Sequence, residues 1–313
     1  MKNKTKITAL AGGVGGAKLA LGLAMSLPSD SLTIIVNTGD DFEYWGLKIC
    51  PDLDTVCYTL AGISNEVSGW GQKDDSWNVY ENIKKLGGPD WFHIGDKDIA
   101  IHLERTQLLK EGQKLSSIVR EFCSRWGIIH QVLPMSDDPV STIVDTYDGS
   151  KLPFQEYFVH QKFAPVVKGF HFEGIQSAKP GPGVLDSIQD SDAVIICPSN
   201  PWVSIDPILS VQGINSALID KKVVGISPIV GGQALKGPAA KIFTELGIKP
   251  SALAVAEHYL GIIDCLVIDT VDEVLETEIN SLNIKTLAVN TIMNTIGSKI
   301  RLAQDVLNFI EKE

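Results

Sequence analysis

The amino-acid sequence predicts an α/β protein built on a doubly wound, mostly parallel, Rossmann-like sheet. Seven short apolar runs rich in β-branched residues recur along the chain, and helical patterns lie between several of them. This alternation is typical of parallel strands joined by helical crossovers. The length of 313 residues, of which 44% are hydrophobic, suits one large domain over residues 1–313. The expected strands are residues 7–10, 32–36, 128–133, 193–197, 223–226, 265–268 and 286–289.

A long segment without strands interrupts this alternation between residues 54 and 126. It contains helical patterns at residues 55–61, 76–86 and 115–126, and we interpret it as a helical insertion that caps one side of the functional site.

Two further elements complete the expected fold. Residues 142–159 are expected to form an antiparallel hairpin that turns at Asp148 and Gly149, because Asp-Gly pairs favour tight hairpin turns. Residues 297–313 have the pattern of an amphipathic helix that closes the fold.

The composition restricts the classes of partner. The net charge of −11 argues against a nucleic-acid surface. No apolar run reaches the roughly 18 residues that cross a bilayer, and the basic residues 1–6 lead directly into a strand, unlike a signal peptide. The five cysteines are scattered without a Cys-x-x-Cys pair, which is typical of reduced thiols. We therefore expect a cytoplasmic protein that binds a small molecule, which can be phosphorylated.

The glycine-rich segment at residues 11–19 is the strongest local signal. It follows an apolar run and precedes a helical pattern, so its backbone can approach a ligand while the positive end of the helix points at the same place. This arrangement predicts a phosphate-binding loop, and the alternative is a tight turn without a ligand. The expected ligand-binding residues are Gly12, Gly13, Gly15, Gly16 and Lys18.

The spacing within this loop matches neither common nucleotide fingerprint. A Walker A loop has Gly before its Lys and Ser or Thr after it, whereas Ala17 precedes Lys18 and Leu19 follows. A dinucleotide fingerprint that starts at Gly13 would place its third glycine at Lys18. The sequence therefore disfavours both an ordinary P-loop ATPase and an NAD enzyme.

Four carboxylates follow the second expected strand, at Asp40, Asp41, Asp52 and Asp54. They predict a Mg²⁺ site near the phosphate loop, because Mg²⁺ often needs only one or two carboxylates besides water and substrate phosphate. Asp40 and Asp54 are the expected ligands. In the alternative interpretation Asp52 is the N-cap of a helix at residues 53–61, Asp54 only favours the helix dipole, and Asp40 lies in a solvated turn.

Other polar loops also follow expected strands, where ligands of parallel sheets bind. Residues 198–207 offer Asn200 and Ser204 to a base or sugar. The acidic residues 134–139 form a rigid loop that we interpret as a turn. His93 lies between apolar neighbours and is either a ligand-binding residue or a structural histidine.

Residues 227–237 resemble a second anion cradle. Gly231 and Gly232 would supply backbone N–H groups, and Lys236 and Lys241 would supply positive charge. Two such loops at matching strand ends favour a phosphate-rich ligand.

Taken in chain order, these segments resemble the 2-phospho-L-lactate transferases, the CofD family of coenzyme F-420 biosynthesis. The likeness covers roughly residues 7–260 and is weaker after residue 265. Each motif is short, but the ordered set is specific. The motifs are Gly12-Gly13-Val14-Gly15-Gly16-Ala17-Lys18-Leu19, Asn37-Thr38-Gly39-Asp40-Asp41, Pro51-Asp52-Leu53-Asp54-Thr55-Val56, Gly95-Asp96-Lys97-Asp98, Leu133-Pro134-Met135-Ser136-Asp137-Asp138-Pro139-Val140, Pro198-Ser199-Asn200-Pro201 and Ser227-Pro228-Ile229-Val230-Gly231-Gly232.

The resemblance implies a single CofD-like domain that transfers a phosphorylated three-carbon acid. The donor would be a guanosine diphosphate diester that carries phospholactate, phosphoenolpyruvate or 3-phosphoglycerate, and GMP would leave. The acceptor would be the ribityl hydroxyl of 7,8-didemethyl-8-hydroxy-5-deazariboflavin. Val14 in the glycine loop is more like the bacterial branch, whose members can use a phosphoenolpyruvyl donor. The resemblance also implies Mg²⁺ and a homodimer.

The resemblance further implies roles for single residues. Asp54 would bind the acceptor hydroxyl or the metal and act as the catalytic base, and the glycine loop would hold the phosphates. Asn200, Ser204 and residues 227–237 would contact the nucleotide. His93 stands where the family more often carries Lys or Arg near the acceptor, so its role differs from the pattern.

Three other functions compete with this interpretation. The first is a non-enzymatic regulator of the YvcK-like sister group, which resembles nucleotide-sugar-binding proteins. The second is a metal-dependent phosphohydrolase, and the third is an NAD enzyme. The segments at residues 51–56 and 133–140 favour the transferase over the regulator.

Overall fold

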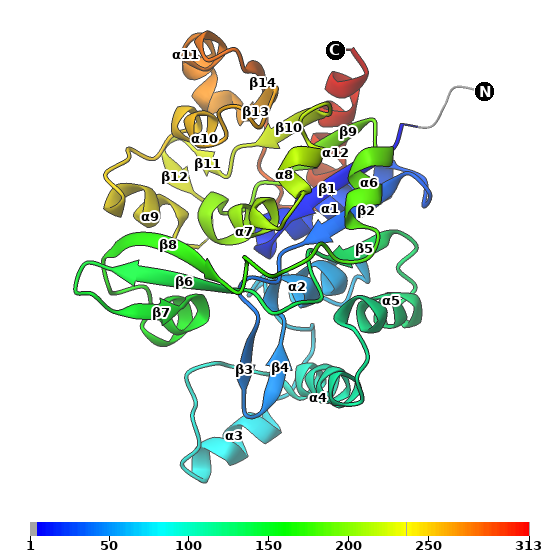
Figure 1. The fold of residues 1–313 in the computed structure, drawn as a ribbon, viewed down its shortest axis with the longest axis vertical. Coiled ribbons are helices and arrows are strands. Elements are labelled where there is room, and N and C mark those ends of the chain that lie inside the picture. Colours follow the sequence, from blue (N-terminus) through cyan, green and yellow to red (C-terminus); the bar gives the residue numbers. More distant parts are fainter. Residues whose placement is uncertain (1–4, 236, 313) are drawn as a thin grey trace.

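The computed structural model describes residues 5–235 and 237–312 and is organised around one seven-stranded sheet (Figure 1). All its neighbouring strands are parallel, in the order β14-β13-β10-β9-β1-β2-β5. Each of the seven predicted runs forms one of these strands, so the predicted fold class is confirmed. The strands are β1 (Ile7–Ala11), β2 (Leu32–Val36), β5 (Gln131–Pro134), β9 (Ala193–Ile196), β10 (Lys222–Ile226), β13 (Cys265–Asp269) and β14 (Lys285–Val289).

Two layers of helices cover the sheet, and strand alternation explains how. Ala9 and Ile34 face one apolar cluster, while Leu10 and Ile35 face the other. The first face is covered by α1 (Gly13–Ser26), α2 (Pro51–Leu60), α5 (Leu115–Arg125) and α12 (Ile296–Lys312). The second is covered by α6 (Val184–Asp190), α7 (Asp206–Ser210), α8 (Ile214–Ala217), α9 (Ala239–Glu245), α10 (Ala252–His258) and α11 (Glu276–Ser281).

The strand order creates a switch point beside β1. The chain first moves from β1 to β2 on one side and later returns to place β9 on the other side. Crossovers in opposite directions leave a crevice at the carboxyl ends of these strands, which is where ligands bind in such sheets.

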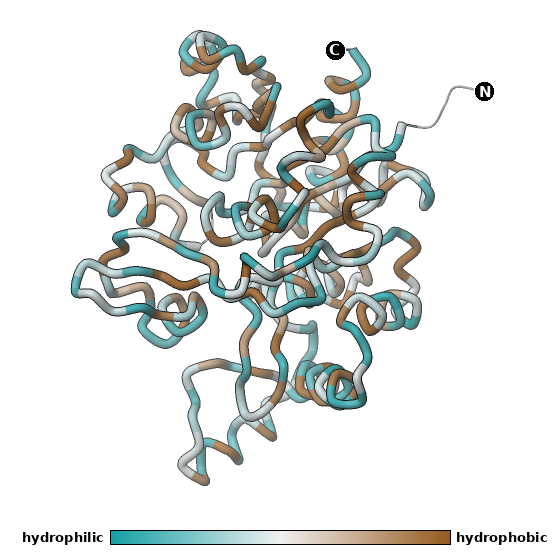
Figure 2. Tube along the Cα trace, in the orientation of Figure 1, coloured by the Kyte–Doolittle hydropathy of each residue, from teal (hydrophilic) through white to brown (hydrophobic). Residues whose placement is uncertain are grey.

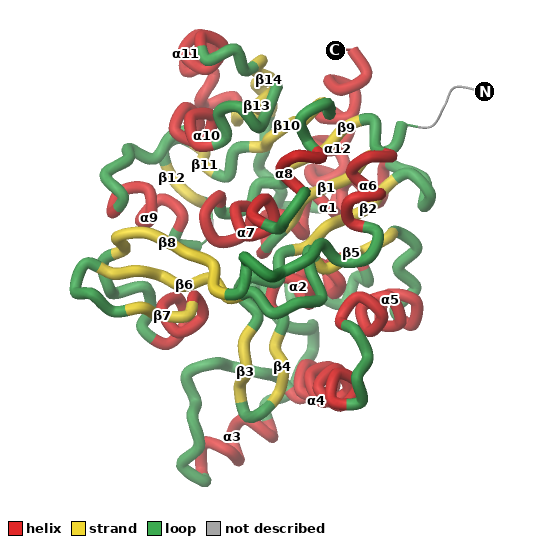
Figure 3. Tube along the Cα trace, in the orientation of Figure 1, coloured by secondary structure: helices red, strands yellow, loops and turns green. Residues whose placement is uncertain are grey.

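The segment at residues 54–126 is helical, as predicted, and Figure 3 shows no strand drawn within it. Besides part of α2 and all of α5 it holds α3 (Asn78–Lys85) and α4 (Asp96–Lys110), of which α4 was not predicted. Helix α5 carries hydrophobic residues on one part of each turn and hydrophilic residues on the rest (Figure 2). The segment lies beside a two-stranded ribbon, β3 (Phe42–Tyr44) and β4 (Leu47–Ile49), at the lower end of Figure 1.

A separate three-stranded antiparallel sheet lies on the other flank. It has the order β7-β6-β8, and the β6–β7 hairpin turns at the predicted Asp148 and Gly149, where Gly149 has a φ of 88°. The predicted hairpin is therefore confirmed, although a π-helical turn at Glu156–His160 replaces its end. The strands are β6 (Ser141–Thr146), β7 (Lys151–Pro153) and β8 (Val167–Glu173), and a small hairpin elsewhere joins β11 (Ile229–Val230) to β12 (Gln233–Ala234).

Two details of the predicted fold need correction or comment. Strand β5 begins at Gln131 and not at residue 128, because Gly127, in a left-handed conformation, follows the end of α5 at Arg125, and Ile129 is exposed. The closing helix is confirmed as α12, and Glu313 lies outside the described residues. Within the described part of the chain, no helix is both long enough and apolar enough to cross a membrane.

Candidate active site

A cavity of about 810 Å³ opens at the carboxyl ends of the central strands. The α1 end, α2 and the loop after β9 supply one part of its wall, and α4 and the segments around Trp91 and Phe158 supply another. Of the predicted site residues, those that line it are Gly12, Gly13, Gly15, Lys18, Asp40, Asp54, His93, Asn200 and Ser204.

The glycine segment is not a loop over its whole length, which corrects the prediction. Helix α1 begins at Gly13, so Gly15 and Gly16 lie in its first turns. A Cβ on Gly15 would stand 2.1 Å from the carbonyl oxygen of Pro198, and one on Gly16 would stand 2.6 Å from Ser199 Oγ. These two glycines therefore allow α1 to pack against the loop after β9, and Gly16 does not line the cavity.

The N-terminal end of α1 already holds an anion of the chain itself. The N–H of Gly13 donates to Asp52 Oδ1 at 2.6 Å, and the N–H of Gly12 donates to Ser199 Oγ at 3.1 Å. Asp52 is thus not the N-cap of its own helix, as the alternative interpretation expected, because α2 begins at Pro51 after Cys50. The next amides of this first turn, at Val14 and Gly15, have no acceptor within the helix and line the cavity.

Asp40 and Asp52 share the side-chain amide of Asn37. Asn37 Nδ2 donates to Asp40 Oδ1 and to Asp52 Oδ2, each at 3.0 Å, and Gln155 Nε2 donates to Asp40 Oδ2 at 3.0 Å. Burial raises the pKa of Asp52 to about 6, and burial with the charges of Asp52 and Asp41 raises the pKa of Asp40 well above its usual range. Both carboxylates line the cavity, so a divalent cation bound there could offset their mutual repulsion.

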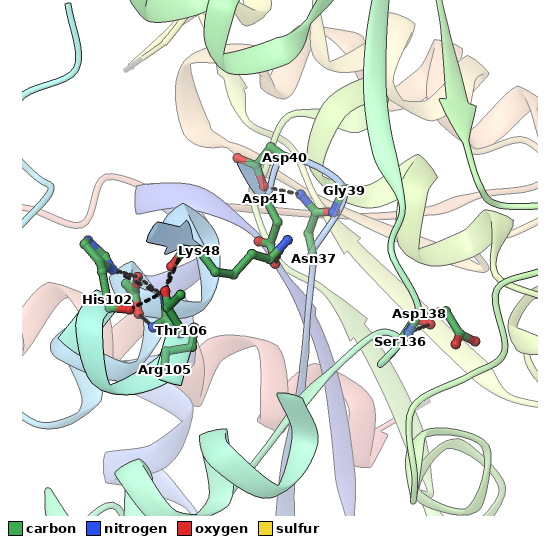
Figure 4. Close-up of polar contacts among 11 residues, drawn as sticks. Asn37, Gly39, Asp40, Asp41, Lys48, His102, Arg105, Thr106, Ser136 and Asp138 are labelled. Atoms are coloured by element: carbon green, nitrogen blue, oxygen red, sulfur yellow. Dashed lines mark hydrogen bonds and ion pairs between the residues drawn. The ribbon is translucent and has the colours of Figure 1, made fainter. Parts of the chain in front are cut away.

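Asp54 lies between the cavity and a buried guanidinium. Arg105 Nη1 donates to Asp54 Oδ2 at 3.1 Å, Arg105 Nη2 donates to Asp54 Oδ1, and His102 Nδ1 lies 3.7 Å from Asp54 Oδ2. Figure 4 shows His102 and Arg105 close together, with Asp40 and Asp41 farther along the wall and Lys48 reaching toward them. Asp54 thus has a specific charge partner, and its role as base or metal ligand stays a prediction. No group of three His, Cys, Asp or Glu in the described chain is arranged to hold a metal by itself.

Helix α4 brings a second buried carboxylate to the same wall. Burial, followed by the charge of Asp54, raises the pKa of Asp98 to about 7, and burial lowers the pKa of His102 to about 4. Asp98 Oδ1 and the hydroxyl of Tyr58 are buried and form no hydrogen bond with the residues that the structure describes. From the sequence, Asp98 was named only as part of a family motif and Tyr58, His102 and Arg105 were not named, although the spacing of Asp98, His102 and Arg105 places them on one face of a helix.

Aromatic side chains form the opposite wall. Trp91 stacks on His160 with ring centres 5.1 Å apart, and Phe154 stacks on Phe158 at 5.5 Å. His93 is exposed at this wall, with its ring 4.6 Å from that of Tyr80, so it belongs to an aromatic group and not to the apolar core. Flat apolar surfaces of this kind suit a planar ring system. Trp70, Trp91, Phe92, Phe154 and Phe158 line the cavity there.

The loop after β9 lies against the start of α1. The side chain of Asn200 accepts from the N–H of Trp202 at 3.1 Å, which leaves its Nδ2 buried without a partner among the described residues. Ser204 lies beside Gly12. Residues 291–294, which follow β14, also line the cavity, and the sequence analysis did not single them out.

The second predicted anion cradle has a different structure. Gly231 and Gly232 have φ values of 57° and 78° and form the turn between β11 and β12, and the N–H of Gly231 donates to Asp272 Oδ2 at 2.9 Å. Neither glycine lines the cavity, so a tight turn explains their presence. Other residues of the predicted segment do line it, namely Ser227, Pro228, Val230, Leu235 and Gly237. Lys236 lies outside the described residues, and Lys241 Nζ contacts Glu245 and the carbonyl of Pro165.

The acidic loop at residues 134–139 serves the fold. Asp137 accepts from the N–H and Oγ of Ser116 at the start of α5, and Asp138 accepts from the N–H of Lys179 at 2.9 Å. Figure 4 shows Ser136 and Asp138 well apart from the carboxylates at Asp40 and Asp41. This loop is therefore the structural turn that we expected.

The family model described as 2-phospho-L-lactate transferase CofD matches residues 7–301. The chain belongs to the CofD family. This CofD-family chain is 42% identical to the phosphoenolpyruvate transferase of Streptomyces griseus, with 98% of this chain and 99% of that protein covered. It is also 42% identical to the 2-phospho-L-lactate transferase of Methanocaldococcus jannaschii, with 97% of each covered. The predicted family and the transferase class are confirmed, and the regulator alternative is not favoured.

The fold of this CofD-family member also occurs among solved structures. A member of the UPF0052 family from Bacillus halodurans has a TM-score of 0.65 at 15% identity, with 98% of this chain and 100% of that chain covered. At this identity the likeness establishes the shared fold only.

Proposed function

We propose that the chain transfers a phosphorylated three-carbon acid from its guanosine diphosphate diester to the ribityl hydroxyl of 7,8-didemethyl-8-hydroxy-5-deazariboflavin, with release of GMP, in coenzyme F-420 biosynthesis. One observation carries this proposal. A single cavity joins a helix end that suits phosphate, a set of buried carboxylates and an aromatic wall that suits a planar ring. Family membership and the names of the relatives support it.

The donor would lie along the wall formed by the start of α1 and the loop after β9, which we call the phosphate side. The amides of Val14 and Gly15 at the start of α1 would bind phosphate oxygens, and Lys18 adds positive charge one turn later. Asn200 Nδ2 is a buried donor without a partner in the described chain, so it would bind an oxygen of the nucleotide together with Ser204. The aromatic wall with Trp91 and His93 would receive the deazaflavin ring.

Mg²⁺ is the proposed cofactor, held by Asp40 and Asp54. Both line the cavity, and Asp40 is buried beside the like charge of Asp52, which a cation would offset. Asp52 accepts from the N–H of Gly13 and from Asn37, so it would hold the start of α1 beside Asp40. When bound, Mg²⁺ would neutralise charge on the donor phosphates.

The reaction would be an in-line displacement at the β-phosphorus. The acceptor hydroxyl oxygen forms a bond to phosphorus, the bond from phosphorus to the GMP oxygen breaks, and Asp54 takes the hydroxyl proton. Arg105 donates to both oxygens of Asp54 and would hold the carboxylate in place for this step. Positioning of both substrates in one cavity supplies much of the acceleration.

A coupled assay tests the proposal. The purified chain is mixed with Mg²⁺, the deazariboflavin, GTP and a guanylyltransferase, with phosphoenolpyruvate, phospholactate or 3-phosphoglycerate added in turn. Mass spectrometry of a deazaflavin phosphodiester would support the transfer and identify the acid. Release of GMP without any deazaflavin product would instead support a phosphohydrolase, and no turnover with any donor would contradict the proposal.

Three further expectations accompany the proposed function. The resemblance implies a cytoplasmic homodimer, and light scattering of the purified chain tests the oligomeric state. The capping role of residues 54–126 is also a proposal, supported by the contribution of Trp70, Trp91 and Asp98 to the cavity wall.

A further inference from the structure

The interface between α2 and α4 contains an unusual group of buried polar side chains. Helix α2 contributes Asp54 and Tyr58, and α4 contributes Asp98, His102 and Arg105, each less than a tenth exposed. Their spacing places each set on one helix face, where packed helices normally present apolar residues. A helix pair that served packing alone would not need this group.

Arg105 is the centre of the group. It is only 2% exposed, and its two terminal nitrogens engage both oxygens of Asp54. The same guanidinium lies 3.3 Å from the carbonyl of Lys48 and 3.4 Å from His102 Nδ1, so it is itself held in place. Asp54 and His102 line the cavity, whereas Arg105 lies behind them.

The energetics of this pair point away from a purely stabilising role. Taking two charges out of water is unfavourable, and apolar residues of similar volume often replace buried ion pairs without loss of stability. The planar guanidinium instead fixes the plane of a carboxylate, because two parallel N–H donors contact its two oxygens. A single ammonium group does not impose this geometry.

We propose that Arg105 is a positioning residue that fixes the carboxylate plane of Asp54, so that the remaining lone pairs of Asp54 face the cavity. This inference rests on the proposed function, in which Asp54 acts on the acceptor hydroxyl and Mg²⁺. Arg105 itself touches neither substrate. Groups that orient a metal-binding or catalytic carboxylate commonly change affinity or activity by about 10-fold to 100-fold when they are replaced.

The test is the variant Arg105→Lys, which keeps the positive charge and removes the pair of N–H groups that bind both oxygens of Asp54. We expect kcat to fall by about 10-fold to 100-fold, with the donor KM within about 3-fold of wild type. Mn²⁺ binding to the chain with GDP, measured by electron paramagnetic resonance without turnover, should weaken by about 10-fold. The control is Arg125→Lys on α5, where Arg125 is exposed and pairs with Glu121. It should match wild type in both measurements.

The outcomes separate the two proposals. Folded Arg105→Lys protein with wild-type kcat and Mn²⁺ binding would overturn the positioning role. If wild-type protein transfers nothing from any donor, the proposed function fails, and the Mn²⁺ titration still decides whether Arg105 organises Asp54. If the variant does not fold, a crystal structure of the wild-type chain with GDP and Mn²⁺ decides: Arg105 must still bond both oxygens of Asp54, and an Arg105 that has left Asp54 contradicts the proposal.

Discussion

The phosphate side and the aromatic side of the cavity are built in different ways. On the phosphate side, α1 and the loop after β9 approach so closely that Gly15 has no room for a Cβ. On the aromatic side, Trp70 is 45% exposed and Trp91 is held by ring contacts with Phe42 and His160. The first arrangement depends on backbone and is rigid, whereas the second depends on side chains. A nucleotide phosphate needs fixed donors, and a larger ring system tolerates a wall that adjusts.

The largest effect is expected for Asp54→Asn, because Asp54 lies where the phosphate side and the aromatic side of the cavity meet. If Asp54 takes the proton of the acceptor hydroxyl or binds Mg²⁺, turnover should fall by about 10²-fold to 10⁴-fold in the coupled assay. The control is Asp190→Asn, an exposed carboxylate at the end of α6. Turnover near the wild-type rate would contradict a catalytic or metal-binding role and would mean that Asp54 only stabilises the first turn of α2.

Trp91→Ala tests the aromatic side alone. Loss of one stacking surface should raise the KM for the deazaflavin by roughly 10-fold, because stacking on an aromatic side chain contributes about 1–3 kcal/mol. The KM for the donor should stay unchanged. Trp91→Phe keeps a ring and should recover most of the loss in steady-state kinetics. An equal change in both KM values would show that the two sides are not independent.

Gly15→Ala tests the rigidity of the phosphate side. The new Cβ would stand 2.1 Å from the carbonyl oxygen of Pro198, so α1 must move. We expect a loss of about 1–3 kcal/mol in the free energy of unfolding, measured by urea denaturation. Gly169→Ala on β8, where a Cβ meets nothing within 4 Å, should change it by less than about 0.5 kcal/mol. A neutral Gly15→Ala would mean that α1 adapts freely.

The smallest effect concerns pH and the start of α3. Hydrogen bonds from Ser76 and then from the N–H of Val79 lower the pKa of Asp96 from 3.8 to about 2. The ionised form is favoured by the fold, so its stabilisation is complete above pH 4 and is lost as the pH falls through 2. Protection of the Val79 amide, its exchange rate relative to an unfolded peptide at the same pH, should therefore decrease over this range. Asp96→Asn should abolish that step, and unchanged protection in wild type would contradict the assigned hydrogen bonds.

The two sides also differ in how well the sequence predicted them. Gly12, Asp40 and Asn200 follow strands of a parallel sheet, and that topology alone places them at one edge. Asp98 and Trp91 come from the segment at residues 54–126, whose folding back onto the sheet has no local signal. Composition and periodicity indicate that this segment is helical, but not which of its faces reaches the cavity.

Two interpretations of residues that follow strands of the central sheet were wrong for local reasons. Gly231 and Gly232 resembled an anion cradle, but a two-residue hairpin turn has the same need for positive φ. Asp52 resembled an N-cap, but its carboxylate instead binds the amide of Gly13 on the neighbouring helix. In both cases one residue type satisfies two different physical requirements, and only the tertiary structure selects between them.

The sharing of one cavity by both sides also has a kinetic consequence. Gly13 and Trp91 line the same space of about 810 Å³, so donor and acceptor must be bound together before a group passes between them. Initial rates measured at several fixed donor concentrations should then give double-reciprocal plots that intersect. Parallel plots would indicate a covalent intermediate on the enzyme and release of GMP before the deazaflavin binds.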